Sequence, residues 1–447
     1  MSASLEQLLR NARIDLVLSR IEKDESVINE VIQSVESEIR SVKFNSILVL
    51  GEIGEKSGAS AILAITRCLK NDDWSIRREA ARSLGKIGRL SETAIIDLCS
   101  LLIDEEPTIR LALISSLGKI GIASTDSITT LKKGLKDKNE LVRAEAAKSI
   151  GLLGVEAFEL IPNLMNGLKD PNWIVRTSSA QSISEIGKGT IKAIPALIQA
   201  LEDKDWRVRY RVVDTLTQIG EPSISGLLNV LSHKNRVVRK GAVEALGELG
   251  IEDPKIIKDL SIILKDKKED VRGKAADSLR SIGKKAAPIL IEALQTSKSK
   301  MSVVIISSIG GIGIDASESI PQLISLMDNK PKIKVAIART LGKIGLNSSE
   351  AIEGLKQLLY DPKTIVRREA ALSLGKIGRK AESAVDDLLY LLNDKKPDVR
   401  WRATEALGKI GLNNPKILSG LQTMIKDECD YVCESADNAI DELTEGN

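Results

Sequence analysis

The feature that most constrains this chain is a repeat with a period of about 33 residues. A glycine that closes a Gly-x-Ile/Leu-Gly-like pattern recurs at intervals of 30 to 34 residues, at Gly54, Gly88, Gly121, Gly154, Gly187, Gly220, Gly250, Gly283, Gly313, Gly345, Gly378 and Gly411. Thr444 holds the same place in a thirteenth, degenerate unit. The 447 residues therefore predict one elongated repeat domain, where length alone suggests about three globular domains.

Each unit ends in a helix that is defined by what we call its arginine position, eleven residues before the stop glycine. The residue before this position is apolar in every unit, and Leu or Ile follows seven residues after it, as in Leu84 and Leu407. These spacings place the apolar residues on one helical face, and glycine, which tolerates positive φ, ends the helix. The arginine positions are Lys43, Arg77, Arg110, Arg143, Arg176, Arg209, Arg239, Arg272, Ser302, Lys334, Arg367, Arg400 and Cys433.

A first helix precedes this second helix in each unit. Its apolar spacing is clear in residues 191–201 and 319–327, and proline recurs near its start, as at Pro162 and Pro195. In nine units an Asp lies in the intervening turn, six residues before the arginine position. Such an Asp can accept backbone N–H groups at the start of the second helix and bind an Arg of the neighbouring unit. We therefore expect a ladder of Asp–Arg pairs along the array.

The repeated segments resemble HEAT repeats. The resemblance lies in residues 203–220 (DKDWRVRYRVVDTLTQIG), 361–378 (DPKTIVRREAALSLGKIG) and 394–411 (DKKPDVRWRATEALGKIG), and it covers about residues 24–447. They are most similar to the short form found in phycobilin lyases and related bacterial and archaeal proteins. The resemblance implies an all-α fold, a right-handed α-solenoid of about 13 HEAT-like helix pairs, used mainly as a binding scaffold. The tetratricopeptide and ankyrin signatures do not occur in the sequence.

The two ends of a stacked array have one uncovered face each, so atypical terminal units are expected. We predict an N-terminal capping helix in residues 1–23, the repeat array in residues 24–426, and the end of a degenerate acidic capping repeat in residues 427–447. The last segment carries eight acidic residues and no Lys or Arg. A solvated cap and an acidic docking tail are both compatible with this composition.

The ninth repeat, residues 284–313, departs from the pattern because its turn lacks the Asp and its arginine position is Ser302. The ladder should be weakest here. The repeat is then either a hinge or an interface in which Val303 and Val304 contact a partner.

Composition excludes several kinds of site. The chain has one histidine, His233, and four cysteines that lack the spacing of a metal site, Cys68, Cys99, Cys429 and Cys433. We expect reduced thiols, no metal site, no cofactor and no catalytic residues. The N-terminus has no secretory signal and the apolar runs are short, so we expect a cytoplasmic protein without membrane contact. The oligomeric state stays open.

The candidate binding surface lies where the repeats vary, at offsets −3, +1, +2 and +5 from the arginine position. Six of the ten aromatic residues occupy two of these offsets, which lie one helical turn apart. Those at −3 are Trp74, Trp173 and Trp206, and those at +1 are Phe44, Tyr210 and Trp401. Trp and Tyr with Arg commonly anchor interfaces. Alternatively, each ring fills a groove between adjacent repeats.

Residues 204–240 hold the densest group of candidates, with eight basic residues against three acidic ones and two interleaved aromatic rings. Such a patch can bind a phosphate backbone and stack bases. The corresponding surface of other repeats alternates in sign, which favours a protein partner. We predict partner-binding roles for Trp74, Trp173, Trp206, Arg207, Tyr210, Arg211, Arg236, Lys240 and Trp401.

The function predicted from the sequence is a non-enzymatic scaffold or adaptor that binds a protein through the concave surface of the solenoid. Nucleic-acid binding through residues 204–240 is an alternative. The resemblance implies another, a phycobilin-lyase-like chromophore lyase or chaperone subunit, so an enzymatic activity would be of the bilin-attachment type. The HEAT-type deoxyhypusine hydroxylases need repeated His-Glu pairs for iron, whereas His233 is followed by Lys234.

Overall fold

The computed structural model describes residues 3–187, 189–295, 297, 299–328 and 330–445, and within these ranges it contains helices and turns but no strand. The chain divides into two compact units, residues 1–230 and residues 231–447. Each is described by itself. We call the first helix of a repeat its A helix and the second its B helix.

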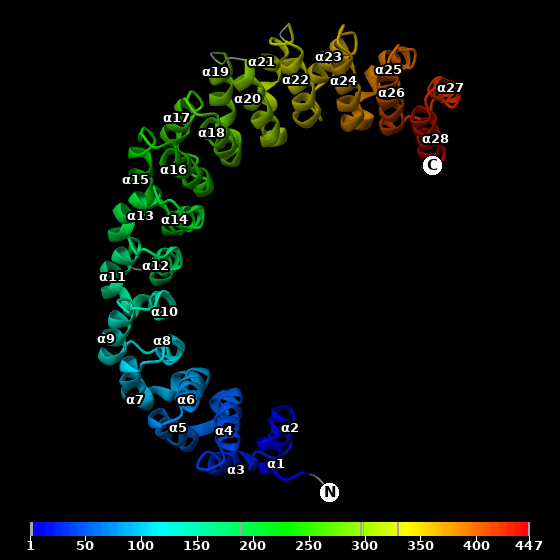
Figure 1. Cartoon of the computed structure of the whole chain (residues 1–447). Coiled ribbons are helices and arrows are strands. Elements are labelled where there is room, and N and C mark those ends of the chain that lie inside the picture. The colour runs from blue at the N-terminus through cyan, green and yellow to red at the C-terminus, as the bar shows by residue number, and fades with distance from the viewer. Residues whose placement is uncertain (1–2, 188, 296, 298, 329, 446–447) are drawn as a thin grey trace. The chain divides into compact units, whose positions relative to one another are not determined.

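The first unit contains the leading helices, six complete helix pairs and one further A helix (Figure 1). In Figure 1 its B helices form one layer, on the inner side of the curve that this unit follows, and its A helices form the other. The B helices are α4 (Arg40–Glu52), α6 (Trp74–Ile87), α8 (Pro107–Ile120), α10 (Glu140–Leu152), α12 (Trp173–Ile186) and α14 (Trp206–Ile219). The A helices are α3 (Val27–Ser34), α5 (Gly58–Arg67), α7 (Ile95–Ser100), α9 (Thr125–Gly134), α11 (Ile161–Gly167), α13 (Ile194–Ala200) and α15 (Ile224–Asn229).

The second unit continues the same alternation and begins with a B helix. Its B helices are α16 (Arg236–Leu249), α18 (Glu269–Ile282), α20 (Ser299–Ile312), α22 (Pro331–Ile344), α24 (Thr364–Ile377), α26 (Pro397–Ile410) and α28 (Asp430–Glu445). Its A helices are α17 (Pro254–Ile263), α19 (Ala287–Gln295), α21 (Ile320–Ile324), α23 (Ser349–Leu358), α25 (Val385–Leu391) and α27 (Pro415–Met424).

Short 3₁₀ segments extend or connect these helices. They are η1 (Gly54–Ser57), η2 (Cys68–Lys70), η3 (Gly88–Ala94), η4 (Leu101–Ile103), η5 (Gly154–Leu160), η6 (Thr190–Ala193), η7 (Glu221–Ser223), η8 (Lys284–Ala286), η9 (Gly313–Ser319) and η10 (Gly378–Ala384). The predicted all-α solenoid of thirteen helix pairs is confirmed, from the pair α3 and α4 to the pair α27 and α28.

The leading segment differs from the single capping helix expected in residues 1–23. It forms two helices, α1 (Leu5–Arg10) and α2 (Ile14–Lys23). Ala12 between them has a φ of 52°, which is outside the right-handed helical region and breaks the helix there. Leu9 of α1 and Val17 of α2 are both fully buried, so each short helix places its own apolar side against the array.

The core lies between the two helix layers and between successive repeats. The Leu or Ile seven residues after the arginine position is buried in twelve repeats, as at Leu84 and Leu407. The corresponding Ile440 of the thirteenth repeat is half-buried. Adjacent repeats pack on each other around these residues, as expected for a stacked array.

The stop glycines have positive φ at eleven of the twelve predicted positions, and Gly345 is the exception with a φ of −91°. The expectation of a left-handed stop is therefore wrong at Gly345. Space explains the glycine there, because an added Cβ would lie 2.5 Å from the Leu341 carbonyl oxygen and 2.4 Å from the Ala351 Cβ.

The Asp–Arg ladder is present. In a typical rung the Nε and Nη2 atoms of Arg110 donate to Asp137 of the next repeat at 2.7 and 2.9 Å, while its Nη1 donates to the Asp104 carbonyl oxygen. Asp137 also accepts the backbone N–H of Asn139, so each rung joins two turns. Ion pairs at the same positions are Arg77–Asp104, Arg110–Asp137, Arg143–Asp170, Arg176–Asp203, Arg239–Asp266, Lys334–Asp361, Arg367–Asp394 and Arg400–Asp427.

The ladder has gaps where the sequence departs from the repeat. His233 occupies an Asp position, and its Nδ1 accepts the Asn235 backbone N–H as an Asp would. In the ninth repeat the Asp position is Thr296, which lies outside the described residues, and Ser302 at the arginine position hydrogen-bonds Ser297.

A second series of contacts brings neighbouring B helices close together. The first glycine of the Gly-x-Ile/Leu-Gly pattern lies against a small residue of the next B helix, so that a Cβ added to Gly118 would be 2.9 Å from the Ser149 Cα. The Ser149 hydroxyl donates to the Ile114 carbonyl oxygen of the preceding B helix at 2.9 Å. Neighbouring B helices are therefore closely packed.

One segment, residues 300–324, is long and apolar enough to span a membrane by length and composition alone. In the structure it is divided among α20, η9 and α21. Ile305, Ile306 and Ile309 of α20 are buried within the repeat packing.

Candidate protein-binding surface

Offset −3 is the first residue of every B helix. Trp74 begins α6, Trp173 begins α12, Trp206 begins α14 and Arg236 begins α16. The variable residues at this offset therefore stand at one end of the B layer. An Asp or Asn directly before the helix caps several of these ends, as Asp205 does for α14.

Two highly exposed aromatic residues lie on α14, beside the first residue of α12. We call Trp173, Trp206, Arg207 and Tyr210 the α14 surface. Trp206 and Tyr210 are 66% and 64% exposed and lie one helical turn apart. The Arg207 guanidinium lies 3.4 Å from the centre of the half-buried Trp173 ring. Trp206 and Tyr210, at offsets −3 and +1, therefore share one face of α14.

Asp205 holds Arg207 against Trp173. The Arg207 Nε and Nη2 atoms donate to the two Asp205 oxygens at 3.0 and 2.7 Å. This side-chain hydrogen bond lowers the pKa of Asp205 to about 2 and raises the pKa of Arg207. Both groups are charged near neutral pH, so the guanidinium keeps its position over the ring.

The basic patch expected in residues 204–240 is divided between the units and partly neutralised. Arg211 pairs with Asp214 at 2.7 Å in the first unit, and Arg236 pairs with Asp270 at 3.5 Å in the second. Arg207 is held by Asp205. These pairings leave less positive charge available to a phosphate backbone than the sequence count indicates.

The other predicted site residues lie apart from the α14 surface. Trp74 is 45% exposed and lies under Arg78, whose guanidinium is 4.9 Å from the ring centre. Lys240 is half-buried on α16. Trp401 is half-buried on α26, with Arg402 stacked 3.7 Å from its ring centre, so its burial fits the alternative that rings fill grooves between repeats.

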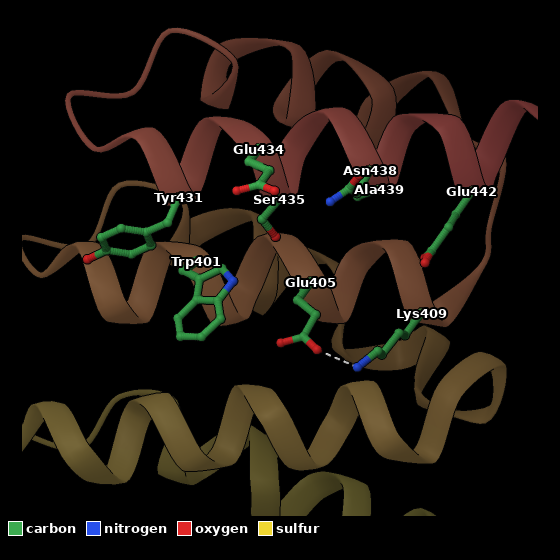
Figure 2. A pocket seen from close by; sticks show the side chains of 9 residues that line it. All are labelled: Trp401, Glu405, Lys409, Tyr431, Glu434, Ser435, Asn438, Ala439 and Glu442. Carbon is green, nitrogen blue, oxygen red and sulfur yellow. Dashed lines mark hydrogen bonds and ion pairs between the residues drawn. The ribbon is translucent and has the colours of Figure 1, made fainter.

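Trp401 lines a groove between the last two B helices, which we call the α26–α28 groove (Figure 2). Its volume is about 370 Å³. Trp401 packs edge-on against Tyr431 at 5.7 Å, and Glu405 pairs with Lys409 one turn further along α26. The α28 side contributes Glu434, Ser435, Asn438, Ala439 and Glu442.

A corresponding groove lies in the first unit between α6 and α8, and we call it the α6–α8 groove. Its volume is about 380 Å³. The lining residues are Arg78 and Arg82 from α6, Thr108, Leu111, Ala112, Ser115, Ser116 and Lys119 from α8, and Glu145 from α10. Its lining is cationic, whereas that of the α26–α28 groove is mostly acidic.

The ninth repeat lines a third groove, of about 610 Å³. Val303 contributes to it together with Pro331 and Ile333 of α22, and Val304 is half-buried beside it. A hinge and an interface therefore both stay hypotheses for this repeat.

The described part of the chain contains no group of three His, Cys, Asp or Glu residues that could hold a metal ion. The cysteines there are unpaired, and burial raises the pKa of the Cys68 thiol to about 11. This thiol therefore stays protonated near neutral pH, which makes it a poor nucleophile.

Comparison with protein families accounts for the repeats. The family model for HEAT repeats matches residues 28–118, 95–184, 161–225, 224–304, 299–375 and 352–439. The chain belongs to the HEAT-repeat family. A comparison with curated proteins finds no match in sequence, so the family assignment rests on the repeats themselves.

Solved structures with a similar fold include importin beta and Kap95p. A structure of importin beta matches with a TM-score of 0.53 and 12% identity over 99% of this HEAT-repeat chain and 73% of that one. A structure of Kap95p matches with a TM-score of 0.51 and 14% identity, over 98% of this chain and 69% of that one. That structure shows how Kap95p binding induces the switch loops of RanGDP to adopt the GTP-bound conformation. At these identities the likeness shows the fold alone.

Sequence reasoning missed most of the groove residues, among them Tyr431, Arg78 and Lys119. An alignment of the repeats would have identified these residues, because the same offsets of neighbouring B helices line each groove. Residues at +1 and +5 of one B helix face residues at −2, +5 and +9 of the next, which aligned repeats would have revealed.

Proposed function

We propose that this HEAT-repeat chain is a scaffold that binds a protein partner through the exposed face of its B helices. The α14 surface carries this proposal. Two large aromatic side chains stand about two-thirds exposed beside an immobilised Arg–Trp stack. Trp, Tyr and Arg are the residue types that most often anchor protein interfaces.

The rigidity of the frame supports a binding role. Arg176 and Asp203 form a buried rung between α12 and α14, and the two helices that bear the surface are thereby fixed to each other. A preorganised surface loses less conformational entropy on binding. The structural similarity to Kap95p, which binds RanGDP, agrees with a protein partner for this fold.

Affinity capture with matched variants tests the proposal. The variant Trp206→Ala/Tyr210→Ala removes the exposed rings of the α14 surface. The control Tyr360→Ala/Tyr390→Ala removes two rings of similar exposure from the second unit, one on α25 and one in the turn after α23. We expect partners that the wild type and the control retain and the α14 variant loses, with all three proteins equally folded by circular dichroism. Identical partner sets for all three would refute this face as the binding surface.

A further inference from the structure

The α6–α8 groove contains cations that have no carboxylate of their own. Within the part of the chain that the structure describes, neither Arg78 nor Lys119 forms an ion pair. The Arg78 Nε is buried without a hydrogen-bond partner, although the guanidinium is stacked on Trp74. A buried N–H without an acceptor costs free energy, so the groove gains stability from a ligand that supplies one.

The nearby acidic side chains do not neutralise these cations. Glu79 is buried and lies 3.9 Å from Arg82, and Glu145 lies 3.8 Å from Lys148 on its own helix. The groove therefore keeps an excess of positive charge at Arg78 and Lys119.

At the same positions in repeats eleven and twelve, the corresponding cations are paired with carboxylates that the first unit lacks. Arg368 corresponds to Arg78, and it pairs with Asp398 at 3.7 Å. Lys409 corresponds to Lys119, and it pairs with Glu405. In the first unit, Thr108 stands in place of Asp398 and Ser115 in place of Glu405. The exchange keeps a hydrogen-bonding group at each position but removes both negative charges.

We propose that the α6–α8 groove binds an acidic segment of a protein partner. The inference rests on the scaffold function proposed above and adds the chemistry of the partner. Carboxylates of such a segment accept hydrogen bonds from Arg78 and Lys119, and the hydroxyls of Thr108 and Ser115 bond its backbone. Leu111 offers an apolar contact for the aliphatic part of its side chains.

The lining favours a peptide over a nucleic acid. The Trp74 ring is already stacked under Arg78 and so offers less surface to a base. The Glu145 carboxylate on the α10 side repels the closely spaced charges of a phosphate backbone, whereas a peptide can place its carboxylates away from it.

The probe is a fluorescein-labelled peptide of alternating Glu and Asp, compared with its Gln/Asn counterpart by fluorescence anisotropy on the full chain. We expect the acidic peptide to bind and the neutral one to bind at least about tenfold more weakly. The variant Arg78→Gln/Lys119→Gln should weaken acidic-peptide binding at least about tenfold. The matched control Arg368→Gln/Lys409→Gln removes the same charges from the same two offsets in the second unit and should change binding less than about twofold.

Equal loss in both variants, or equal binding of the neutral peptide, would overturn the proposal. So would an oligonucleotide that binds more tightly than the peptide and is lost in Arg78→Gln/Lys119→Gln, because it would make the groove a nucleic-acid site. The scaffold function is tested separately through α14, so partner capture that depends on Trp206 and Tyr210 would survive a failure here.

Discussion

The α6–α8 and α26–α28 grooves are built from the same offsets of the repeat but carry opposite chemistry. Arg82 in the first groove corresponds to Glu405 in the second, and Lys119 corresponds to Glu442. Arg78 corresponds to Trp401. A few side chains at fixed offsets therefore change the charge of a groove, while two neighbouring B helices form it in both cases.

The frame beneath the two grooves is the same. A rung joins the repeats in each case, Arg77–Asp104 in the first and Arg400–Asp427 in the second. The glycines that bring the helices together are Gly85 and Gly408. The rungs and glycines are thus alike in the two grooves, whereas the lining side chains differ. Four predictions test this comparison between the grooves.

The largest effect is expected from breaking the rungs. Arg400→Ala leaves Asp427, which is 5% exposed, without its cation and should cost about 3–5 kcal/mol of unfolding free energy. Arg77→Ala affects a more exposed pair and should cost less, about 1–3 kcal/mol. Urea unfolding followed by circular dichroism measures both. The surface substitution Arg368→Ala should cost under about 1 kcal/mol, and an equal loss in all three would contradict the structural role of the rungs.

Acid should weaken the second groove through the same rung. The hydrogen bond from Arg400 lowers the pKa of Asp427, against the opposing effect of burial. Because the folded pKa lies below the unfolded value of about 3.9, the stabilisation is complete above that pH and is lost as the pH falls through the folded pKa. The urea midpoint should thus be level near neutral pH and fall below about pH 4. In Arg400→Ala the fall should be shallower, and an unchanged slope would show that this rung does not titrate.

Alanine at the close-approach glycines should distinguish the packing of the two grooves. A Cβ at Gly85 would lie 2.8 Å from the Ser116 Cα, whereas one at Gly408 would lie 3.1 Å from the Ala439 Cα. We expect Gly85→Ala to cost about 1–3 kcal/mol and Gly408→Ala to cost less, because the added Cβ of Gly85→Ala lies closer to the backbone of the next helix. Thermal unfolding compares them. A larger loss for Gly408→Ala would mean that this distance does not control the cost.

The smallest effect on stability is expected from an exchange of residues between repeats. This exchange is also the most direct test of the charge difference. Thr108→Asp/Ser115→Glu gives the α6–α8 groove the carboxylates that neutralise Arg368 and Lys409 in the second unit. Affinity for the acidic peptide should fall about tenfold, while stability changes by less than about 1 kcal/mol. Unchanged affinity, measured by anisotropy, would show that Arg78 and Lys119 do not bind the peptide.

Local patterns predicted the frame well. The period, the apolar offsets and the Asp–Arg spacing led to the thirteen helix pairs and to the rungs, such as Arg110–Asp137, because a regular repeat brings equal offsets together. They also placed Trp206 and Tyr210 on one face. They failed at Ala12, where two short helices replace one, and at Gly345, where space and not φ requires glycine.

The grooves were beyond sequence reasoning for a physical reason. The sequence by itself determined the helix pairs, the ladder and the position of the variable residues, because hydrogen bonding and apolar periodicity are local. Only the tertiary structure decided that Arg368 is paired and Arg78 is not, and that Trp401 is covered by Arg402 while Trp206 is exposed. Charge pairing depends on distances of a few ångströms between side chains of different repeats, and these are set when the helices pack.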